Sequence, residues 1–379
     1  MKYALIGCGR ISPNHVVAAK NNGLDIVALC DIDRANAEDK ILKFDLNNYA
    51  TERAQSTDNS NNTETSNNTG RVNIYEDYKQ LLDIERPELV AICTESGKHA
   101  QIALDCIAFG ANVIIEKPIA LSIADADAII EAGRKQGVLV CACHQNRFNK
   151  SIQEIRKAIE KKRFGKLLYG TAHIRWTRDH NYYDRAAWRG TWEQDGGALM
   201  NQCIHDIDLL RWMMGDEIDT VYGVTDRLIH PYIEAEDLGL AVVKFKNGSY
   251  GTIEGTTNVF PKNLEETLYI FGEKGTVKAG GEAVNIIEEW KFADYFGDEE
   301  QVKRDCSENP PNIYGFGHTK LYKNVINAIE GKEKLLVDGE AGKRALELVL
   351  AIYKSAAEGK AVQLPLEKCS TMDFVGRFN

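Results

Sequence analysis

The feature that most constrains the fold of this chain is a glycine turn near its start. Gly7-Cys8-Gly9 joins an apolar stretch, Lys2–Ile6, to a helical stretch, Ile11–Asn22. Gly7 permits a tight turn, and Gly9 lets the backbone approach a pyrophosphate, whose charge then meets the helix N-terminus. A second apolar stretch ends at Asp31, where a carboxylate can bind ribose hydroxyls. The turn therefore predicts a dinucleotide site in a strand–turn–helix unit.

The identity of the dinucleotide follows from the charges near this turn. The Asp31 carboxylate would repel a 2′-phosphate, so the sequence favours NAD as the cofactor over NADP. Arg34 keeps NADP as the less favoured alternative, because an arginine here can pair with that phosphate. The predicted cofactor contacts of the turn are Gly7, Gly9, Arg10, Ile11 and Asp31.

Short apolar runs alternate with helical stretches through the first part of the chain. Buried parallel strands appear as continuous β-branched runs, and regular alternation with helices is typical of a doubly wound sheet. We therefore assign residues 1–146 to an NAD-binding Rossmann domain. The predicted strands are Lys2–Ile6, Asp25–Asp31, Leu89–Cys93, Asn112–Ile115 and Val138–Cys143, and the predicted helices are Ile11–Asn22, Arg34–Phe44, Asp77–Leu82, Lys98–Phe109 and Ile123–Lys135.

Residues 47–70 interrupt this alternation with a stretch rich in Asn, Thr and Ser. Such a composition buries little apolar area, so it predicts a flexible surface insertion. The alternative is a lid over the adenine end of the cofactor.

The second half of the chain has a different pattern. Long strand-like stretches follow one another, and Lys246-Asn247-Gly248 and Gly272-Glu273-Lys274-Gly275 are hairpin signals. Two helices, near 314–330 and 340–358, close the chain. The fold class is therefore α/β, with a second α+β domain at 147–379 that carries a large, mostly antiparallel open sheet. The predicted strands are Lys166–Thr177, Thr220–Leu228, Leu238–Phe245, Ser249–Thr257 and Glu266–Phe271.

Composition excludes several classes of partner. The 379 residues carry a net charge of −10 without a concentrated basic stripe, which argues against nucleic acid. The longest apolar runs are too short to span a bilayer, and no signal segment leads the chain, so we expect a cytoplasmic protein without a membrane partner. The nine cysteines are scattered, and Cys141-Ala-Cys143-His144 lacks the spacing of a zinc site, so we expect no metal.

Polar residues follow two of the predicted parallel strands. Ligands bind outside the carboxyl ends of such strands, where Thr94-Glu95-Ser96 with His99, and Glu116-Lys117-Pro118, both fall. A lysine at this edge can hydrogen-bond a substrate hydroxyl and accept or relay its proton. The alternative is a surface lysine before a helix-starting proline, and the motif alone does not decide between them.

A second polar cluster follows Asp195-Gly196-Gly197. Asn201, His205 and Asp208 recur at helical spacing, which predicts a polar stripe on a half-buried helix. Such a stripe suits a polyol substrate, and the pKa of a histidine lies near working pH, so His205 is a candidate acid/base. The alternative is a purely structural histidine, although the alignment of three polar residues favours function.

Between these clusters lies a segment that mixes aromatic residues with arginines. Such residues can stack on a sugar or base and pair with a carboxylate or phosphate. They can equally be packing residues of the core or of an interface. The candidates for substrate binding are Arg178, Tyr183, Trp188 and Arg189.

Together these motifs resemble the Gfo/Idh/MocA oxidoreductases over nearly the whole chain. The matching segments are Gly7–Ile11, Thr94…His99, Glu116-Lys117-Pro118, Gln145-Asn146-Arg147-Phe148 and Gly196-Gly197…Asn201…His205…Asp208. The resemblance implies catalytic Lys117 and His205, a substrate-positioning Asp208, and nicotinamide contacts near Lys117 and Arg147. It also implies cofactor contacts at Thr94, Ser96, His99, Glu116 and Asn146, and a homodimer or homotetramer formed through the C-terminal sheet.

The substrate class is indicated by one departure within the motif. Many members of the family have an aspartate where this chain has Asn201. In having an asparagine there, the chain resembles the branch of the family that acts on nucleotide sugars. With Trp188–Trp192, it resembles enzymes that oxidise C3 of UDP-N-acetyl-2-amino-2-deoxyglucuronate. The alternatives are an inositol or simple-sugar dehydrogenase of the same family and an NAD-sensing regulator of the same fold.

Overall fold

A computed structural model describes residues 1–58, 70–294, 297–308 and 315–379. The chain forms two compact units, which are described separately. The units do not follow one cut in the sequence. Unit 1 comprises Met1–Glu116, Asp127–Cys143 and His318–Gly339, and unit 2 comprises Lys117–Ala126, His144–Gly317 and Glu340–Asn379. The predicted division into 1–146 and 147–379 therefore differs from these units, because it assigns His318–Gly339 to the second domain.

The sheet of unit 1 is entirely parallel, with strand order β3-β2-β1-β4-β5-β6. This order confirms the predicted Rossmann fold, with the reversal of strand order between β1 and β4. The sequence prediction omitted β3, which is too short to show a periodic pattern. The strands are β1 Lys2–Ile6, β2 Asp25–Cys30, β3 Asn73–Tyr75, β4 Leu89–Ile92, β5 Asn112–Ile115 and β6 Val140–Ala142.

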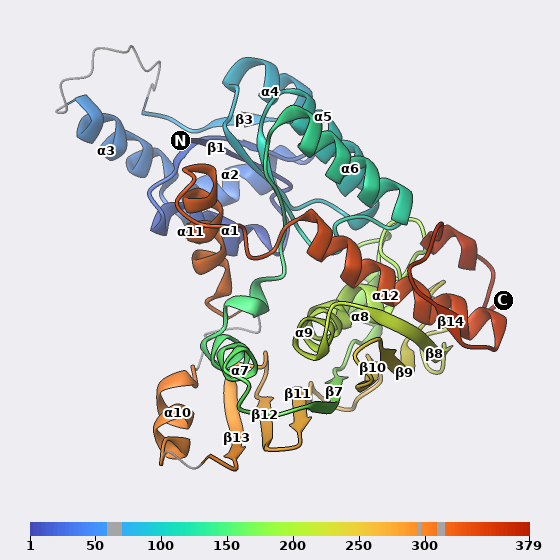
Figure 1. The fold of residues 1–379 in the computed structure, drawn as a ribbon. Helices are drawn as coiled ribbons and strands as arrows, with labels where there is room; N and C mark the ends of the chain where they lie inside the picture. Colours follow the sequence, from blue (N-terminus) through green and yellow to red (C-terminus); the bar gives the residue numbers. More distant parts are fainter. Residues whose placement is uncertain (59–69, 295–296, 309–314) are drawn as a thin grey trace. The chain divides into compact units, whose positions relative to one another are not determined.

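Helices cover both faces of this sheet: α1 and α11 lie on one side, and α5 and α6 on the other (Figure 1). Asp33 and Asp77 begin α2 and α4, because each side chain accepts a hydrogen bond from a backbone N–H of the first turn. The helices are α1 Ser12–Asn21, α2 Arg34–Lys43, α3 Leu46–Asp58, α4 Tyr78–Glu85, α5 His99–Ala108, α6 Ile123–Gln136 and α11 Gly317–Ile329.

The first half of the predicted flexible insertion is instead a helix, α3. Leu46 and Ala50 are buried, and the Tyr49 hydroxyl donates to the Leu24 carbonyl oxygen at 2.7 Å. These few contacts anchor the helix, and they were hidden by the polar residues that surround them in the sequence. Residues 59–69 of the predicted insertion lie outside the described residues.

The sheet of unit 2 has the order β13-β12-β11-β7-β10-β9-β8-β14. Among the described strands of this sheet, β7 and β10 pair in parallel and the other pairs are antiparallel, which confirms the predicted sheet. Two strands after the second hairpin, and the short β14, were not predicted. The strands are β7 Leu167–Arg175, β8 Ile218–Asp226, β9 Leu238–Phe245, β10 Tyr250–Thr256, β11 Glu265–Gly272, β12 Gly275–Gly280, β13 Ile286–Phe292 and β14 Val362–Gln363.

One face of this sheet is covered by α9, which packs on β7, β10 and β11. Glycines allow the close approach of the turn Leu199–Cys203, which precedes α9: a Cβ on Gly239 would lie 2.4 Å from Leu199 Cδ1, and one on Gly255 would lie 2.7 Å from Cys203 Sγ. The helices of unit 2 are α7 Lys150–Glu160, α8 His180–Asp184, α9 Ile204–Met214, α10 Glu299–Cys306 and α12 Gly339–Glu358.

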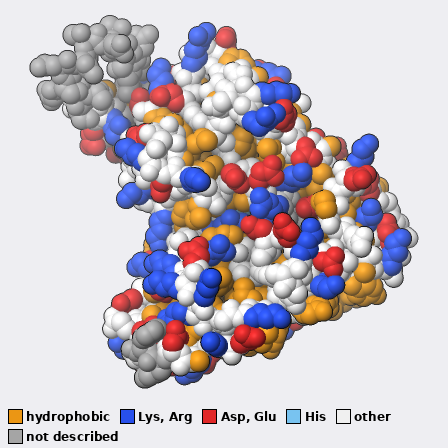
Figure 2. All heavy atoms as spheres, viewed as in Figure 1, with side chains coloured by type: hydrophobic (Ala, Val, Ile, Leu, Met, Phe, Trp, Pro, Cys, Tyr) orange, Lys and Arg blue, Asp and Glu red, His pale blue; other side chains and the backbone are white. Residues whose placement is uncertain are grey.

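Two surface properties bear on the predicted partners. Within the residues that the structure describes, no helix combines the length and apolarity needed to cross a membrane. On the face drawn in Figure 2, basic and acidic side chains intermingle, while hydrophobic side chains gather over β8–β10 at the lower edge.

Candidate functional site

The glycine turn of unit 1 has the geometry of a phosphate cradle. Gly7 has a φ of +92°, and a Cβ there would lie 2.5 Å from the carbonyl carbon of Cys93. Apart from its two chain neighbours, no heavy atom of the described residues would lie within 4 Å of a Cβ on Gly9, so the backbone is open on that side. Arg10 is exposed and Ile11 half-buried immediately before α1. This turn therefore fits the pyrophosphate of a dinucleotide at a helix N-terminus.

The Asp31 carboxylate is held beside this turn. Its Oδ2 accepts from the Cys8 backbone N–H at 2.7 Å, and its Oδ1 accepts from the Asn36 amide at 3.2 Å. Both bonds orient a half-buried carboxylate at the end of β2, where a ribose would be bound.

The residues after β4 form a compact turn. His99 is buried and its Nε2 lies 3.1 Å from the Thr94 carbonyl oxygen, while Ser96 is buried within a short 3₁₀ turn. His99 thus braces the loop. The predicted cofactor contacts of Thr94, Ser96 and His99 stay predictions.

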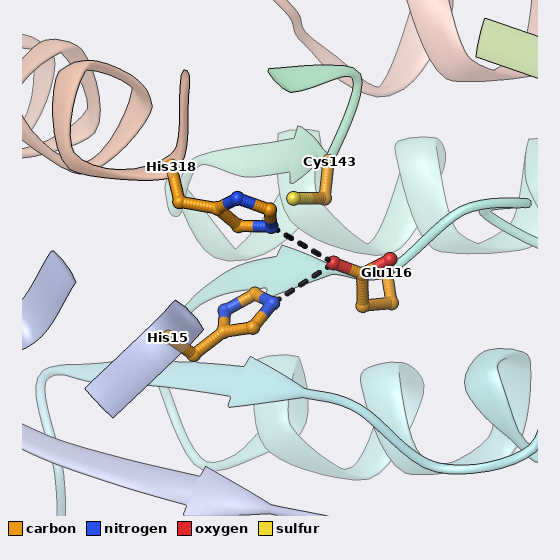
Figure 3. Close-up of side chains that lie close together, drawn as sticks. All are labelled: His15, Glu116, Cys143 and His318. Atoms are coloured by element: carbon orange, nitrogen blue, oxygen red, sulfur yellow. Dashed lines mark hydrogen bonds and ion pairs between the residues drawn. The ribbon is translucent and has the colours of Figure 1, made fainter. Parts of the chain in front are cut away.

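Glu116, the residue before Lys117, lies in a buried cluster with His15, Cys143 and His318 (Figure 3). His15 Nε2 lies 2.8 Å and His318 Nε2 lies 3.6 Å from Glu116 Oε1. Burial acts to raise the pKa of Glu116, but the two imidazoles outweigh it and hold the pKa well below its usual range. The cluster therefore joins α1, β5, β6 and α11 around one ionised carboxylate.

The spacing within this cluster is that of hydrogen bonding. Two ligands on a tetrahedral zinc ion lie about 3.3 Å apart, since each Zn–N bond is about 2.0–2.1 Å. The 2.8 Å between His15 and Glu116 is shorter than this. The Tyr322 hydroxyl lies 2.7 Å from His15 Nδ1 and completes the hydrogen bonds of that ring. We therefore describe the cluster as hydrogen-bonded, and the expected lack of a metal stays a prediction.

In unit 2, Lys117 and Asn201 lie together. The Lys117 ammonium donates to the Asn201 backbone oxygen at 2.7 Å and to its side-chain oxygen at 3.3 Å. Both residues are half-buried, so the amine is fixed in position yet accessible. This contact brings together two predicted site residues that are distant in the sequence.

Asp195 is a functional candidate to which the sequence analysis gave no role. It accepts hydrogen bonds from the Gly190 backbone N–H at 2.7 Å and from the Asn201 side-chain amide. Burial raises the pKa of Asp195 to about 7, although these hydrogen bonds oppose the shift. The only signal in the sequence was its position directly before the two glycines.

His205 lies deeper than the predicted polar stripe implied. Its ring packs edge-on against His144, with ring centroids 5.7 Å apart, and its Nε2 lies 3.5 Å from Gln145 Nε2. The expected half-buried helix was wrong, because every residue of α9 is buried. The stripe was also not continuous, since Leu199–Cys203 form a π-helical turn that changes the spacing of Asn201 relative to His205.

Asp208 and Arg147 form a buried ion pair. Arg147 donates to the two carboxylate oxygens at 2.7 and 2.6 Å, and its guanidinium lies 4.7 Å from the Trp212 ring centroid. Burial acts to raise the pKa of Asp208, but Arg147, together with His144 and Arg211, outweighs burial and holds the pKa well below its usual range. Asn146, also buried, donates to Glu266 at 3.3 Å. The substrate and nicotinamide contacts predicted for Asp208, Arg147 and Asn146 stay predictions, and this geometry favours a supporting role.

The aromatic and arginine residues form one cluster around Tyr182. The guanidinium groups of Arg178 and Arg189 lie 4.9 and 4.3 Å from its ring centroid, and Arg189 also lies 5.5 Å from that of Trp188. Arg178 donates to the Thr177 and Asn263 oxygens, and Arg189 to the Tyr182 oxygen. These acceptors are neutral, so those bonds do not neutralise the two positive charges. Tyr183 is buried beside them.

Comparison with known proteins identifies the family. Residues 1–144 match the NAD-binding Rossmann fold of the Gfo/Idh/MocA oxidoreductase family, and residues 156–364 match its C-terminal α/β domain. The chain belongs to the Gfo/Idh/MocA family. The predicted family, oxidoreductase class and NAD cofactor are thereby confirmed, and we refer to the chain as this Gfo/Idh/MocA oxidoreductase.

Two solved structures are similar over almost the full length of this Gfo/Idh/MocA oxidoreductase. The WlbA dehydrogenase from Bordetella pertussis, in complex with NADH and UDP-GlcNAcA, is 36% identical, with 97% of this chain and 98% of that chain covered and a TM-score of 0.82. WlbA from Chromobacterium violaceum, with the same ligands, is 34% identical, with 97% and 96% covered and a TM-score of 0.84. Myo-inositol 2-dehydrogenase from Thermotoga maritima is 26% identical, with 76% of this chain and 84% of that protein covered.

Proposed function

We propose that this oxidoreductase transfers a hydride between NAD and C3 of a UDP-linked N-acetyl amino sugar uronate. The observation that carries the proposal is the contact of Lys117 with Asn201. It combines a fixed amine with the asparagine that distinguished the nucleotide-sugar branch in the sequence. The 36% identity to a dehydrogenase that was crystallised with NADH and UDP-GlcNAcA supports the same substrate class.

Lys117 serves as the general base in the oxidising direction. Its neutral amine takes the proton of the reacting hydroxyl, and the two Asn201 oxygens accept hydrogen bonds from the ammonium that forms. Bound NAD supplies the hydride acceptor. His205 is the second acid/base candidate, with Gln145 and His144 beside its ring.

The arginine cluster suits the anionic parts of such a substrate. Arg178 and Arg189 are half-buried and bound to neutral oxygens, so their charge can pair with a diphosphate or a uronate carboxylate. Trp188 and Tyr182 supply aromatic faces beside them, on which a sugar or base can stack.

A second candidate substrate is a free polyol. The similarity to myo-inositol 2-dehydrogenase favours it, at 26% identity over 303 residues. A free polyol carries no anionic group with which the charges of Arg178 and Arg189 could pair.

Substrate-induced stabilisation and turnover separate the two candidates. We would measure the melting temperature and NADH production with UDP-GlcNAcA, UDP-GlcNAc and myo-inositol, each with NAD. A ligand at about a hundred times its Kd adds roughly 2.7 kcal/mol to stability, which a melting curve resolves. Stabilisation and NADH production with UDP-GlcNAcA alone support the proposal. Turnover of myo-inositol without turnover of UDP-GlcNAcA would replace it with the polyol dehydrogenase.

We also propose that copies of this chain pair through the open face of the unit 2 sheet. Tyr222, Val224, Leu240, Val242 and Tyr250 are 40–51% exposed on its strands, and hydrophobic side chains gather over this part of the surface (Figure 2). A contiguous exposed apolar patch is typical of a protein–protein interface. Val242→Asp should reduce the mass measured by light scattering to that of the monomer, whereas an unchanged mass would exclude this face.

A further inference from the structure

Three side chains of unit 2 form a continuous hydrogen-bonded chain from a buried carboxylate to the proposed base. Asp195 accepts from the Asn201 side-chain amide, and the Asn201 side-chain oxygen accepts from the Lys117 ammonium. Asp195 is 2% exposed, and its second oxygen is fixed by the Gly190 N–H. The carboxylate is therefore rigidly held on the far side of the amide from Lys117.

The charges at its two ends determine the orientation of the Asn201 amide. An ammonium is only a donor and an ionised carboxylate is only an acceptor, so the amide oxygen must face Lys117 and the amide nitrogen must face Asp195. Hydrogen bonds in such a chain polarise one another, and a carboxylate at one end makes the amide oxygen a stronger acceptor at the other.

We infer that Asp195 is a positioning residue that acts through Asn201 to orient Lys117 and to stabilise the positive charge formed there during substrate oxidation. The inference rests on the proposed role of Lys117 and deepens it. Asn201 is a neutral amide, and the negative charge is supplied by Asp195, which lies behind that amide as seen from Lys117.

Other groups face Asp195 and contribute to its ionisation. Lys117 and Arg189 favour the anion, whereas Glu236 and Tyr183, when ionised, are repelled by it. Because burial sets the pKa of Asp195 to about 7, its charge changes within the working pH range of an enzyme. The pH dependence of catalysis therefore reports on the chain of hydrogen bonds.

The test is the pH profile of kcat/KM for UDP-GlcNAcA with NAD, measured for the wild type and Asp195→Asn. Loss of one negative charge makes Lys117 release its proton more readily. The pH at which kcat/KM reaches half its maximum should then fall by about one unit, the scale of a single charge at an effective dielectric near 20. A folded Asp195→Asn enzyme with an unchanged profile would overturn the inference.

Two further variants test whether the charge of Asp195 acts on Lys117 through Asn201, a path that we call the relay, or independently of Asn201. If the effect travels through Asn201, then Asp195→Asn adds no further shift in an Asn201→Ala background, whereas a full shift there would overturn the relay. Asn201→Ala alone should move the profile in the same direction, which keeps the test valid should Asp195→Asn fail to fold. Glu234→Gln is the control, because this exposed acid accepts a hydrogen bond from the Trp192 N–H and is not among the charges that act on Asp195, so it should leave the profile in place.

The outcome also distinguishes this inference from the function on which it rests. A wild-type enzyme that reduces no NAD with UDP-GlcNAcA would overturn the proposed substrate, and the relay to a catalytic Lys117 with it. Turnover by the wild type with an unshifted Asp195→Asn profile would overturn the relay alone.

Discussion

Two buried aspartates of unit 2 have pKa values that are shifted in opposite directions. Asp208 and Asp195 are 0% and 2% exposed, and burial acts to raise the pKa of both, yet the pKa of Asp208 lies well below its usual range. Asp208 receives a bidentate ion pair from Arg147 and is ionised at any ordinary pH. Asp195 receives an amide and a backbone N–H, and its pKa stays near 7.

The difference shows that the partner, and not the depth of burial, decides the charge of an inward-facing carboxylate. A charged partner offsets the free-energy cost of desolvating the carboxylate, whereas neutral hydrogen-bond donors offset only part of that cost. The Arg147–Asp208 pair is thus suited to holding the fold at all pH values. The Asp195–Asn201–Lys117 chain can change its protonation, as an acid/base site requires.

The largest expected effect tests whether the Asp195–Asn201–Lys117 chain belongs to the active site. Lys117→Ala should lower kcat by about 10²–10⁴-fold, the usual contribution of a general acid/base group. NADH formation from UDP-GlcNAcA at saturating NAD measures it. Lys135→Ala, which removes an exposed lysine paired with Glu131, should stay within about twofold of the wild type. A Lys117→Ala enzyme with kcat within about threefold of the wild type would remove Lys117 from the mechanism.

The next largest effect tests whether the Arg147–Asp208 pair stabilises the fold. Arg147→Met leaves Asp208 as a buried charge without its principal partner, and it should lower the free energy of unfolding by about 3–5 kcal/mol. Urea denaturation measures the loss. Arg156→Met is the matched control, because Arg156 stacks on the same Trp212 ring at 5.0 Å but pairs with exposed Glu160. It should cost about 1 kcal/mol or less, and equal losses in both variants would refute the distinction.

A third prediction concerns Glu236, whose hydrogen-bond donors are all neutral. It accepts from the Leu199 N–H at 2.7 Å and the Tyr353 hydroxyl at 2.9 Å, and burial raises its pKa to about 8. The folded protein therefore holds this proton where the unfolded chain has lost it, so the stability that the proton provides is lost as pH rises from about 4.5 to about 8.

Glu236→Gln should remove this dependence. Relative to the wild type, the variant should gain about 3 kcal/mol in stability between pH 5 and pH 8, measured by denaturation at each pH. Glu217→Gln, at an exposed glutamate, should follow the wild type. If the wild type and Glu236→Gln lose stability in parallel, the neutral-partner explanation is wrong.

The smallest expected effect extends the comparison to unit 1, where imidazoles keep Glu116 ionised. Tyr322 orients one of them through the 2.7 Å contact with His15 Nδ1, and its hydroxyl also lies 2.9 Å from that of Tyr3. Tyr322→Phe should lower the free energy of unfolding by about 1 kcal/mol. A neutral result for Tyr322→Phe would mean that His15 needs no second partner.

Much of the fold could be predicted because it depends on local patterns. The strand Lys2–Ile6 and the turn at Gly7 were readable from apolar runs and glycines, as was the alternation of strands and helices along the first part of the chain. β3 and α3 were missed because three residues show no period, and because a polar helix anchored by Leu46 and Ala50 resembles a loop.

The candidate site was predictable only in part. Lys117 and Asn201 stood out because chemically active residue types follow a strand end and a glycine pair. Helical spacing misplaced Asn201, because a π-helical turn precedes α9, and no spacing rule connects Asp195 to Lys117. The environment of a side chain depends on residues that are distant in the chain, which a single sequence does not order in space.

The sequence by itself determined the family, the two sheet types and the NAD-binding turn, because each depends on residues that are close together in the chain. The tertiary structure decided which carboxylates are charged. Asp195, Asp208, Glu116 and Glu236 are all acidic in the sequence, and only their partners separate an ionised anchor from a titrating group. Ionisation depends on burial and on the charge of the neighbours, and both are set by folding.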